Sequence, residues 1–154
     1  MSLFSSAKSF GPVPSRRLGM SMGINNIPAK ACTYACIYCQ VGRTMLLTRN
    51  RCEFYEPEKI YQAVQKKVAK ALESGIKTDY LTFVPDGEPT LDVNLGKTID
   101  LLKPLGIPIA VITNSSLMWR TDVRRELAKA DWVSLKMDAF EDGIWRRIIR
   151  REVF

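Results

Sequence analysis

The sequence predicts an α/β fold in which parallel strands alternate with helices. Short apolar segments with strand-like spacing are each followed by a longer segment with helical spacing, and this order repeats four times. The composition agrees, because 154 residues with 46% hydrophobic and 25% charged residues suit one domain with a substantial core. We therefore expect a single domain over residues 1–154 whose strands are joined by helical crossovers.

The first unit begins with a short strand. Met22 and Ile24 alternate with small or polar residues, which indicates a strand over 21–25. A helix begins at Pro57 and stops at Gly75, because proline is favoured in the first turn and glycine after the last. The apolar residues of this helix recur every four positions, at Ile60, Val64, Val68 and Leu72.

Three further units follow the same order. We expect their strands over 80–84, 109–112 and 132–137. The helices after them have apolar residues three or four positions apart: Leu95, Ile99 and Leu102; Val123 and Leu127; Ile144 and Ile148. We expect the last helix to run to the C-terminus. Residues 1–18 precede the first unit as an ordered cap or a loose arm.

The cysteine loop, residues 32–39, follows the first strand and contains Cys32, Cys36 and Cys39. Three soft sulfurs in one loop suit an iron–sulfur cluster, which normally takes four cysteines, so one iron would stay open for another molecule. The chain has no histidine, which excludes zinc sites built from cysteine and histidine. An open iron indicates chemistry rather than a purely structural site.

Polar segments also follow the other predicted strands, at 86–90, 114–116 and 137–138. Ligands of open α/β sheets bind at the carboxyl ends of the strands, so these segments and the cysteine loop are expected to form one site.

The bulk properties indicate a cytoplasmic protein. No run of about 18 apolar residues and no charged segment followed by an apolar one is present, so neither a membrane span nor a secretory signal is predicted. Cysteines packed into one loop of such a chain favour metal binding over disulfides. A net charge of +7, concentrated at 43–51 and 146–151, would help an encounter with a polyanion and makes RNA a candidate partner.

Several motifs along the chain agree with one family. They are Pro-Ser-Arg-Arg at 14–17, Gly-Ile-Asn-Asn at 23–26, the cysteine loop with Gln-Val-Gly-Arg-Thr at 40–44, Asp-Gly-Glu-Pro-Thr at 86–90, Thr-Asn-Ser-Ser at 113–116 and Ser-Leu-Lys-Met-Asp at 134–138. In this order they resemble the radical S-adenosylmethionine (radical SAM) superfamily, and most nearly a prokaryotic branch described as iron–sulfur oxidoreductases.

The resemblance implies a 4Fe–4S cluster on Cys32, Cys36 and Cys39 whose open iron takes the amino and carboxylate groups of S-adenosylmethionine. An electron, supplied by a donor such as ferredoxin or flavodoxin, would then cleave this molecule reductively to methionine and a 5'-deoxyadenosyl radical. The radical would abstract hydrogen from a substrate that the sequence does not identify. The cofactors carry this chemistry, and the protein binds and orients them.

The resemblance also assigns side chains to the ligand. Tyr38 matches an aromatic position beside the adenine, and Glu88 matches the carboxylate that receives the amino group, with Gly87 allowing close approach of the backbone. Asp86 replaces the usual first glycine of this turn. The remaining assignments are Asn114 and Lys136 to the methionine carboxylate, and Ser134 and Asp138 to the ribose hydroxyls. Because Ser134, Lys136 and Asp138 alternate along the predicted strand, they are expected to share one face.

The chain departs from the family at its end. Barrels of this family usually have six strand–helix units, whereas four are predicted here, and residues 146–154 do not follow the family pattern. We therefore expect a C-terminally truncated, partial (β/α) barrel that binds a cluster but has impaired turnover. Two alternatives remain: a structural or electron-transfer iron–sulfur module with Cys52 as fourth ligand, and a basic nucleic-acid-binding fragment without metal.

Overall fold

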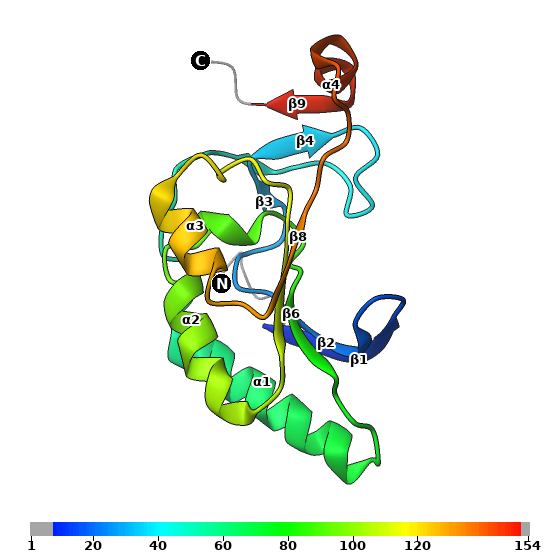
Figure 1. Cartoon of the computed structure of the whole chain (residues 1–154), viewed down its shortest axis with the longest axis vertical. Coiled ribbons are helices and arrows are strands. Elements are labelled where there is room, and N and C mark those ends of the chain that lie inside the picture. The colour runs from blue at the N-terminus through cyan, green and yellow to red at the C-terminus, as the bar shows by residue number, and fades with distance from the viewer. Residues whose placement is uncertain (1–7, 152–154) are drawn as a thin grey trace.

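The computed structural model describes residues 8–151 and contains one five-stranded sheet (Figure 1). The order across the sheet is β1-β2-β6-β7-β8, in which β2, β6, β7 and β8 are parallel and β1 is antiparallel to β2. The strand bounds are β1 Ser9–Ser15, β2 Gly19–Ile24, β6 Tyr80–Phe83, β7 Ile109–Thr113 and β8 Trp132–Leu135. The predicted α/β fold with four parallel strand–helix units is confirmed.

The helices that follow the parallel strands are α1 (Pro57–Glu73), α2 (Leu95–Leu102), α3 (Thr121–Leu127) and α4 (Asp142–Ile148). Figure 1 shows α1, α2 and α3 on one side of the sheet, whereas α4 lies beyond its end. Short 3₁₀ turns, η1 (Pro89–Leu91) and η2 (Lys103–Leu105), flank α2. None of the helices between residues 8 and 151 is long and apolar enough to cross a membrane.

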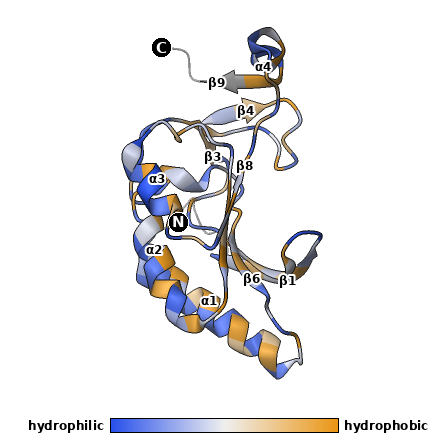
Figure 2. Cartoon of the chain, viewed as in Figure 1, coloured by the Kyte–Doolittle hydropathy of each residue, from blue (hydrophilic) through white to orange (hydrophobic). Residues whose placement is uncertain are grey.

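The core lies between the sheet and the three helices that cover it. Figure 2 shows apolar and polar residues alternating around α1 and α2, as expected for helices with one face on a sheet. The largest fully buried side chains come from both layers: Met22, Ile24, Leu81, Phe83 and Ile109 from strands, and Ile60, Leu95, Ile99 and Leu102 from helices. This core holds the carboxyl ends of the strands in register.

The apolar stripe of α1 is only partly buried. Ile60 and Val64 are fully buried and Val68 is partly buried, whereas the Leu72 side chain is 70% exposed. Four residues rotate a helix by about 400°, so a spacing of four moves each successive side chain about 40° around the axis. By the third step the stripe has turned away from the sheet, and Leu72 faces solvent.

The last helix does not run to the C-terminus, so that prediction is wrong. Helix α4 ends at Ile148, and β9 (Ile149–Arg151) pairs antiparallel with β4 (Tyr34–Cys36) inside the cysteine loop. The Ile149 side chain is buried, and the Tyr34 and Trp145 rings meet edge to face with centroids 5.5 Å apart. The β-branched side chain of Ile149 suits an extended backbone, and pairing with β4 favours a strand here over a further helical turn. Residues 152–154 lie outside the described part.

The N-terminal segment is ordered where it is described. Strand β1 pairs with β2, and the ring of Phe10 occupies the space that a side chain at Gly23 would fill. Residues 9–15 are therefore an edge strand rather than a loose arm, while residues 1–7 of the expected cap or arm lie outside the described residues. At the other edge, β8 ends at Leu135, two residues earlier than predicted.

The burial pattern of α1 predicts a large loss of stability at one apolar position and a small one at another. The substitution Ile60→Ala is expected to lower the free energy of unfolding by about 2–5 kcal/mol, because it leaves a cavity in the core. Leu72→Ala, on the same helix, is expected to change it by less than about 0.5 kcal/mol. Urea denaturation of both variants measures the difference, and an equally large loss for Leu72→Ala would contradict the exposed position of this side chain.

Candidate functional site

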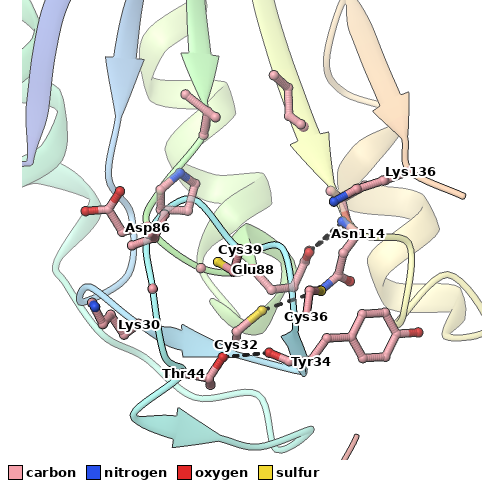
Figure 3. Close-up of a pocket in the computed structure, with 17 residues that line it drawn as sticks. Lys30, Cys32, Tyr34, Cys36, Cys39, Thr44, Asp86, Glu88, Asn114 and Lys136 are labelled. Atoms are coloured by element: carbon pink, nitrogen blue, oxygen red, sulfur yellow. Dashed lines mark hydrogen bonds between the residues drawn. The ribbon is translucent and has the colours of Figure 1, made fainter. Parts of the chain in front are cut away.

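A cavity of about 180 Å³ lies at the carboxyl ends of the parallel strands (Figure 3). It is bordered by the cysteine loop, by the turns after β6 and β7, and by Lys136 beyond the end of β8. Predicted site residues that line it are Cys32, Cys36, Cys39, Gly87, Glu88, Asn114 and Lys136. Other lining residues include Lys30, Thr44, Asp86 and Thr113, which the sequence analysis did not assign to the ligand.

Short strand pairings frame the cysteine loop. Strand β3 (Ala31–Cys32) pairs with β5 (Leu46–Leu47), and β4 pairs with β9. Within the loop, the Cys39 N–H donates to the Cys36 carbonyl at 3.2 Å, which forms a tight turn between the last two cysteines. Lys30, just before β3, has a φ of 66°, so the chain makes a left-handed turn as it enters the loop. These contacts direct all three thiols toward the same cavity.

The turn after β6 is docked on the start of the cysteine loop. The Lys30 N–H donates to the Asp86 carbonyl at 2.6 Å, and the Glu88 N–H donates to the Ala31 carbonyl at 3.1 Å. A Cβ at Gly87 would lie 1.9 Å from the Ala31 carbonyl oxygen, so only glycine fits. In this structure the close approach at Gly87 is thus made by the backbone of the cysteine loop.

Glu88 is a buried carboxylate that joins the ends of two strands. Its Oε1 accepts hydrogen bonds from the Thr90 N–H (3.1 Å), the Thr90 hydroxyl (2.5 Å) and the Thr113 hydroxyl (2.6 Å), and its Oε2 accepts from the Asn114 N–H at 2.7 Å. Burial raises the pKa of Glu88, and these donors oppose that shift. Thr90 and Thr113 stand in the motifs at 86–90 and 113–116, but the motifs alone did not indicate that their hydroxyls bind Glu88.

Asn114 connects the end of β7 to the cysteine loop. Its Nδ2 donates to the Thr33 hydroxyl at 2.8 Å and to the Cys32 sulfur at 3.6 Å, and its Oδ1 accepts from the Ser116 N–H at 3.0 Å. Thr33 is buried, and its hydroxyl also lies 2.6 Å from the Ser116 hydroxyl. Thr33 was missed because a threonine between two cysteines carries no pattern of its own.

Lys136, Tyr38 and Asp138 form a polar group at the rim of the cavity. The Lys136 Nζ lies 4.3 Å from the centroid of the Tyr38 ring and 3.6 Å from the Asp138 carboxylate. Partial burial raises the pKa of Tyr38, as do hydrogen bonds to Asp138 and Cys36. Tyr38 and Asp138 are not among the lining residues, and neither is the half-buried Ser134, which lies on β8 opposite Ile112.

The thiols of Cys32 and Cys36 are partly desolvated. Burial raises the pKa of Cys32 to about 11, and burial also raises the pKa of Cys36, against which Tyr38 and the Lys136 charge act. The Cys32 thiol is therefore protonated at neutral pH in the metal-free chain, and metal binding must displace its proton.

The donor set fits a cluster better than a single ion. Among residues 8–151, no three Cys, Asp or Glu side chains converge tightly enough to hold one metal ion. In a cluster each cysteine binds a different iron, so the sulfurs must surround a volume rather than meet at a point. Thiols from Cys32, Cys36 and Cys39 around one cavity meet that requirement, and two lysines, Lys30 and Lys136, border it with positive charge.

Cys52 and Arg51 lie apart from this cavity. Cys52 is exposed and forms an isolated parallel bridge with Asp92, and it does not line the cavity. The Arg51 side chain is 4% exposed and forms ion pairs with Asp122 and Glu126. Arg51 therefore ties the segment after the cysteine loop to α3, and it does not belong to an exposed basic patch over 43–51.

Comparison with known proteins shows the family to which the chain belongs. The sequence matches the family model of the Radical SAM superfamily over residues 26–154. This range includes the cysteine loop and all the other elements that border the cavity. The chain belongs to the radical SAM superfamily, as its motifs indicated, and members of this superfamily typically use a 4Fe–4S cluster and S-adenosylmethionine.

Individual relatives extend the comparison. A UPF0026 protein of Methanocaldococcus jannaschii is 57% identical over 141 residues, which cover 92% of this chain and 43% of that protein. A protein named GTPase Obg from Brachyspira hyodysenteriae is 40% identical over 131 residues, 84% of this chain but 19% of that protein. The structure of TYW1 with a lysine–pyruvate adduct bound has a TM-score of 0.62 and 21% identity, covering 84% of this chain and 45% of that one. The TYW1 likeness supports the fold, and this chain spans less than half the length of each of these proteins.

The docking of Gly87 predicts a local effect of enlarging its side chain. Gly87→Ala is expected to push the turn away from Ala31 and to lower the free energy of unfolding by about 1–3 kcal/mol. Hydrogen exchange of the Glu88 amide, which donates to Ala31, should become faster. Gly143→Ala is the matched control, because the nearest atom there is 3.8 Å away. Unchanged exchange at Glu88 would show that the turn tolerates the methyl group.

Proposed function

We propose that this chain binds a 4Fe–4S cluster through Cys32, Cys36 and Cys39 and S-adenosylmethionine at the open iron. The observation that carries the proposal is that these three thiols surround one cavity at the carboxyl ends of β6, β7 and β8. When bound and reduced, the cluster supplies the electron that cleaves S-adenosylmethionine to methionine and a 5'-deoxyadenosyl radical. Membership of the radical SAM superfamily supports this assignment.

The turn after β6 is proposed to hold the amino group of the ligand. Within residues 8–151, Glu88 Oε2 accepts one hydrogen bond, from the Asn114 N–H, which leaves a further lone pair for an ammonium donor. Because Gly87 is packed on the cysteine loop, this turn stays fixed relative to the three thiols. Glu88 thereby positions the amino group without moving either strand end.

Two side chains on the opposite side of the cavity are proposed to hold the methionine carboxylate. Figure 3 shows Asn114 and Lys136 on the side away from Lys30 and Asp86. Lys136 supplies a positive charge, and Asn114 supplies the amide hydrogen that it now gives to Thr33. Thr33 keeps its contact with the Ser116 hydroxyl, so this exchange leaves no hydroxyl unpaired.

The nucleoside end is proposed to lie at the rim. The Tyr38 side chain is 43% exposed and offers a flat ring for adenine, although Lys136 now lies over that ring at 4.3 Å. Adenine must therefore use the other face or displace the lysine toward the carboxylate. Ser134 and Asp138 remain the proposed partners of the ribose hydroxyls. A ferredoxin or flavodoxin is the proposed electron donor, and RNA remains a candidate class of substrate.

The two other functions have less support from the geometry. A module with Cys52 as fourth ligand requires this cysteine at the cavity. Cys52 instead lies outside it, where its backbone forms a β-bridge with Asp92. A metal-free nucleic-acid-binding fragment requires exposed basic segments. Because Arg51 is buried and paired with two carboxylates, the segment 43–51 has less positive charge available at the surface than its sequence indicates.

Cluster binding is tested by substituting cysteines one at a time. After anaerobic reconstitution, the wild-type chain is expected to hold about four iron and four sulfide ions, and Cys36→Ala is expected to lose most of them. Cys52→Ser is the matched control and should keep a full cluster. Iron and sulfide counting measures both. A cluster lost with Cys52 but kept with Cys36 absent would contradict the proposed ligand set.

The open iron is tested by electron paramagnetic resonance of the reduced protein. Added S-adenosylmethionine is expected to change the spectrum, because it would bind directly to an iron. Release of 5'-deoxyadenosine under dithionite then reports cleavage separately from binding. An unchanged spectrum in a protein with a full cluster would contradict the proposed binding mode.

The charge of Lys136 predicts a specific loss of ligand affinity. Lys136→Gln is expected to weaken S-adenosylmethionine binding about ten- to a hundredfold, since a charge-assisted hydrogen bond contributes about 1.5–3 kcal/mol. Lys30→Gln removes a charge from the opposite side of the same cavity and should have a smaller effect. Titration followed by electron paramagnetic resonance gives both affinities. A larger loss for Lys30→Gln would assign the carboxylate to the other side.

A further inference from the structure

The Asn114 side chain makes a contact that ligand binding alone does not explain. Its Nδ2 lies 3.6 Å from the sulfur of Cys32, and Figure 3 marks this hydrogen bond across the cavity wall. This hydrogen bond links the residue after β7 directly to a proposed cluster ligand. The question is what an amide donor does at that sulfur.

The orientation of the amide is fixed by its other partners. Oδ1 accepts from the Ser116 N–H at 3.0 Å, so a flipped amide would place two N–H donors against each other there. One Nδ2 hydrogen is directed to the Thr33 hydroxyl at 2.8 Å. The second hydrogen is therefore held toward Cys32.

The backbone of Asn114 is held as firmly as its side chain. Its N–H donates to Glu88 Oε2 at 2.7 Å, and Glu88 is buried with three further donors on Oε1. Thr33 is buried next to Cys32 and is in turn bonded to Ser116. Before a ligand binds, the amide and the sulfur thus belong to one interlocked group, which holds the contact between them.

A hydrogen-bond donor at a cluster thiolate stabilises the negative charge of the cluster. Reduction by one electron adds negative charge that is shared by the sulfurs, and a hydrogen bond to a more negative acceptor is stronger. Hydrogen bonds to cluster sulfurs are among the factors that set the reduction potential of iron–sulfur sites. The donor therefore stabilises the reduced state more than the oxidised state.

We propose that Asn114 is a positioning residue that raises the reduction potential of the cluster by donating a hydrogen bond to the Cys32 sulfur. This inference rests on the proposed function, because it requires a cluster on Cys32. It goes beyond that function by giving Asn114 a role before S-adenosylmethionine arrives. The electron comes from an external one-electron reductant, and Asn114 itself is neither oxidised nor reduced.

The test is a redox titration without S-adenosylmethionine, so that any role of Asn114 in ligand binding does not contribute. Asn114→Leu keeps a similar volume and removes the donor. Its cluster is expected to be about tenfold harder to reduce, which corresponds to a potential about 59 mV more negative for one electron. The readout is the electron paramagnetic resonance signal of the reduced cluster against applied potential.

Ser116→Ala is the matched control. It removes the hydroxyl contact to Thr33 from the same interlocked group but leaves the Asn114 amide and Cys32 in place. Its potential is expected to equal that of the wild type. Equal shifts in both variants would overturn the inference, since they would reflect loosening of the loop. An unchanged potential in Asn114→Leu with full iron content would also overturn it.

A measurement on the unaltered protein decides the matter if Asn114→Leu does not fold. In wild-type chain labelled with ¹⁵N-asparagine, pulsed electron paramagnetic resonance of the reduced cluster is expected to detect a nitrogen coupling through this hydrogen bond. The absence of that coupling would overturn this inference but not the proposed function. Absence of any cluster in the wild type would overturn the proposed function and this inference together.

Discussion

The buried carboxylate of Glu88 is the constraint on which the rest of the site depends. A charged group away from water must be surrounded by donors, and Glu88 draws them from Thr90, Thr113 and the Asn114 backbone. These contacts fix the ends of β6 and β7 relative to each other. The Glu88 N–H extends the same group to Ala31, at the start of the cysteine loop. One ionisable side chain thereby holds three separate segments in one arrangement.

Most polar groups at the cavity already have partners within the protein. The Asn114 amide is shared between Thr33, Ser116 and Cys32, and Lys136 lies between the Tyr38 ring and Asp138. Binding of a charged ligand would therefore exchange existing hydrogen bonds for new ones. Because the net gain of such an exchange is small for each bond, affinity must come from several contacts acting together with the metal.

The sequence was sufficient for the parts of the structure that depend on periodicity. Alternation in 21–25 indicated one strand, because side chains on a sheet repeat every two residues. The continuous apolar run at 109–112 indicated another, because parallel strands are buried on both faces. The predicted order of strands also brings seven of the predicted site residues to one cavity at the carboxyl ends of the strands. Their roles toward a ligand stay predictions.

Periodicity was not sufficient where long-range contacts decide the outcome. Thr90 and Thr113 belong to motifs and Thr33 to the cysteine loop, but their roles follow only from which groups lie beside them in space. Arg51 belonged to a basic segment in the sequence and is buried between two carboxylates in the structure. Ile149 directly follows the helical spacing of Ile144 and Ile148, yet it is extended because β4 offers backbone partners.

The pairing of β4 with β9 has a consequence for the order in which the chain folds. Cys36 is opposite Ile149, so a segment near the start of the described chain is completed by one near its end. Contacts between residues far apart in sequence form late, because the entropy of closing a long loop must first be overcome. The β4–β9 side of the frame around the cysteine loop is therefore expected to form after the local β3–β5 side, and a cluster inserted during synthesis would enter a site still open toward β9.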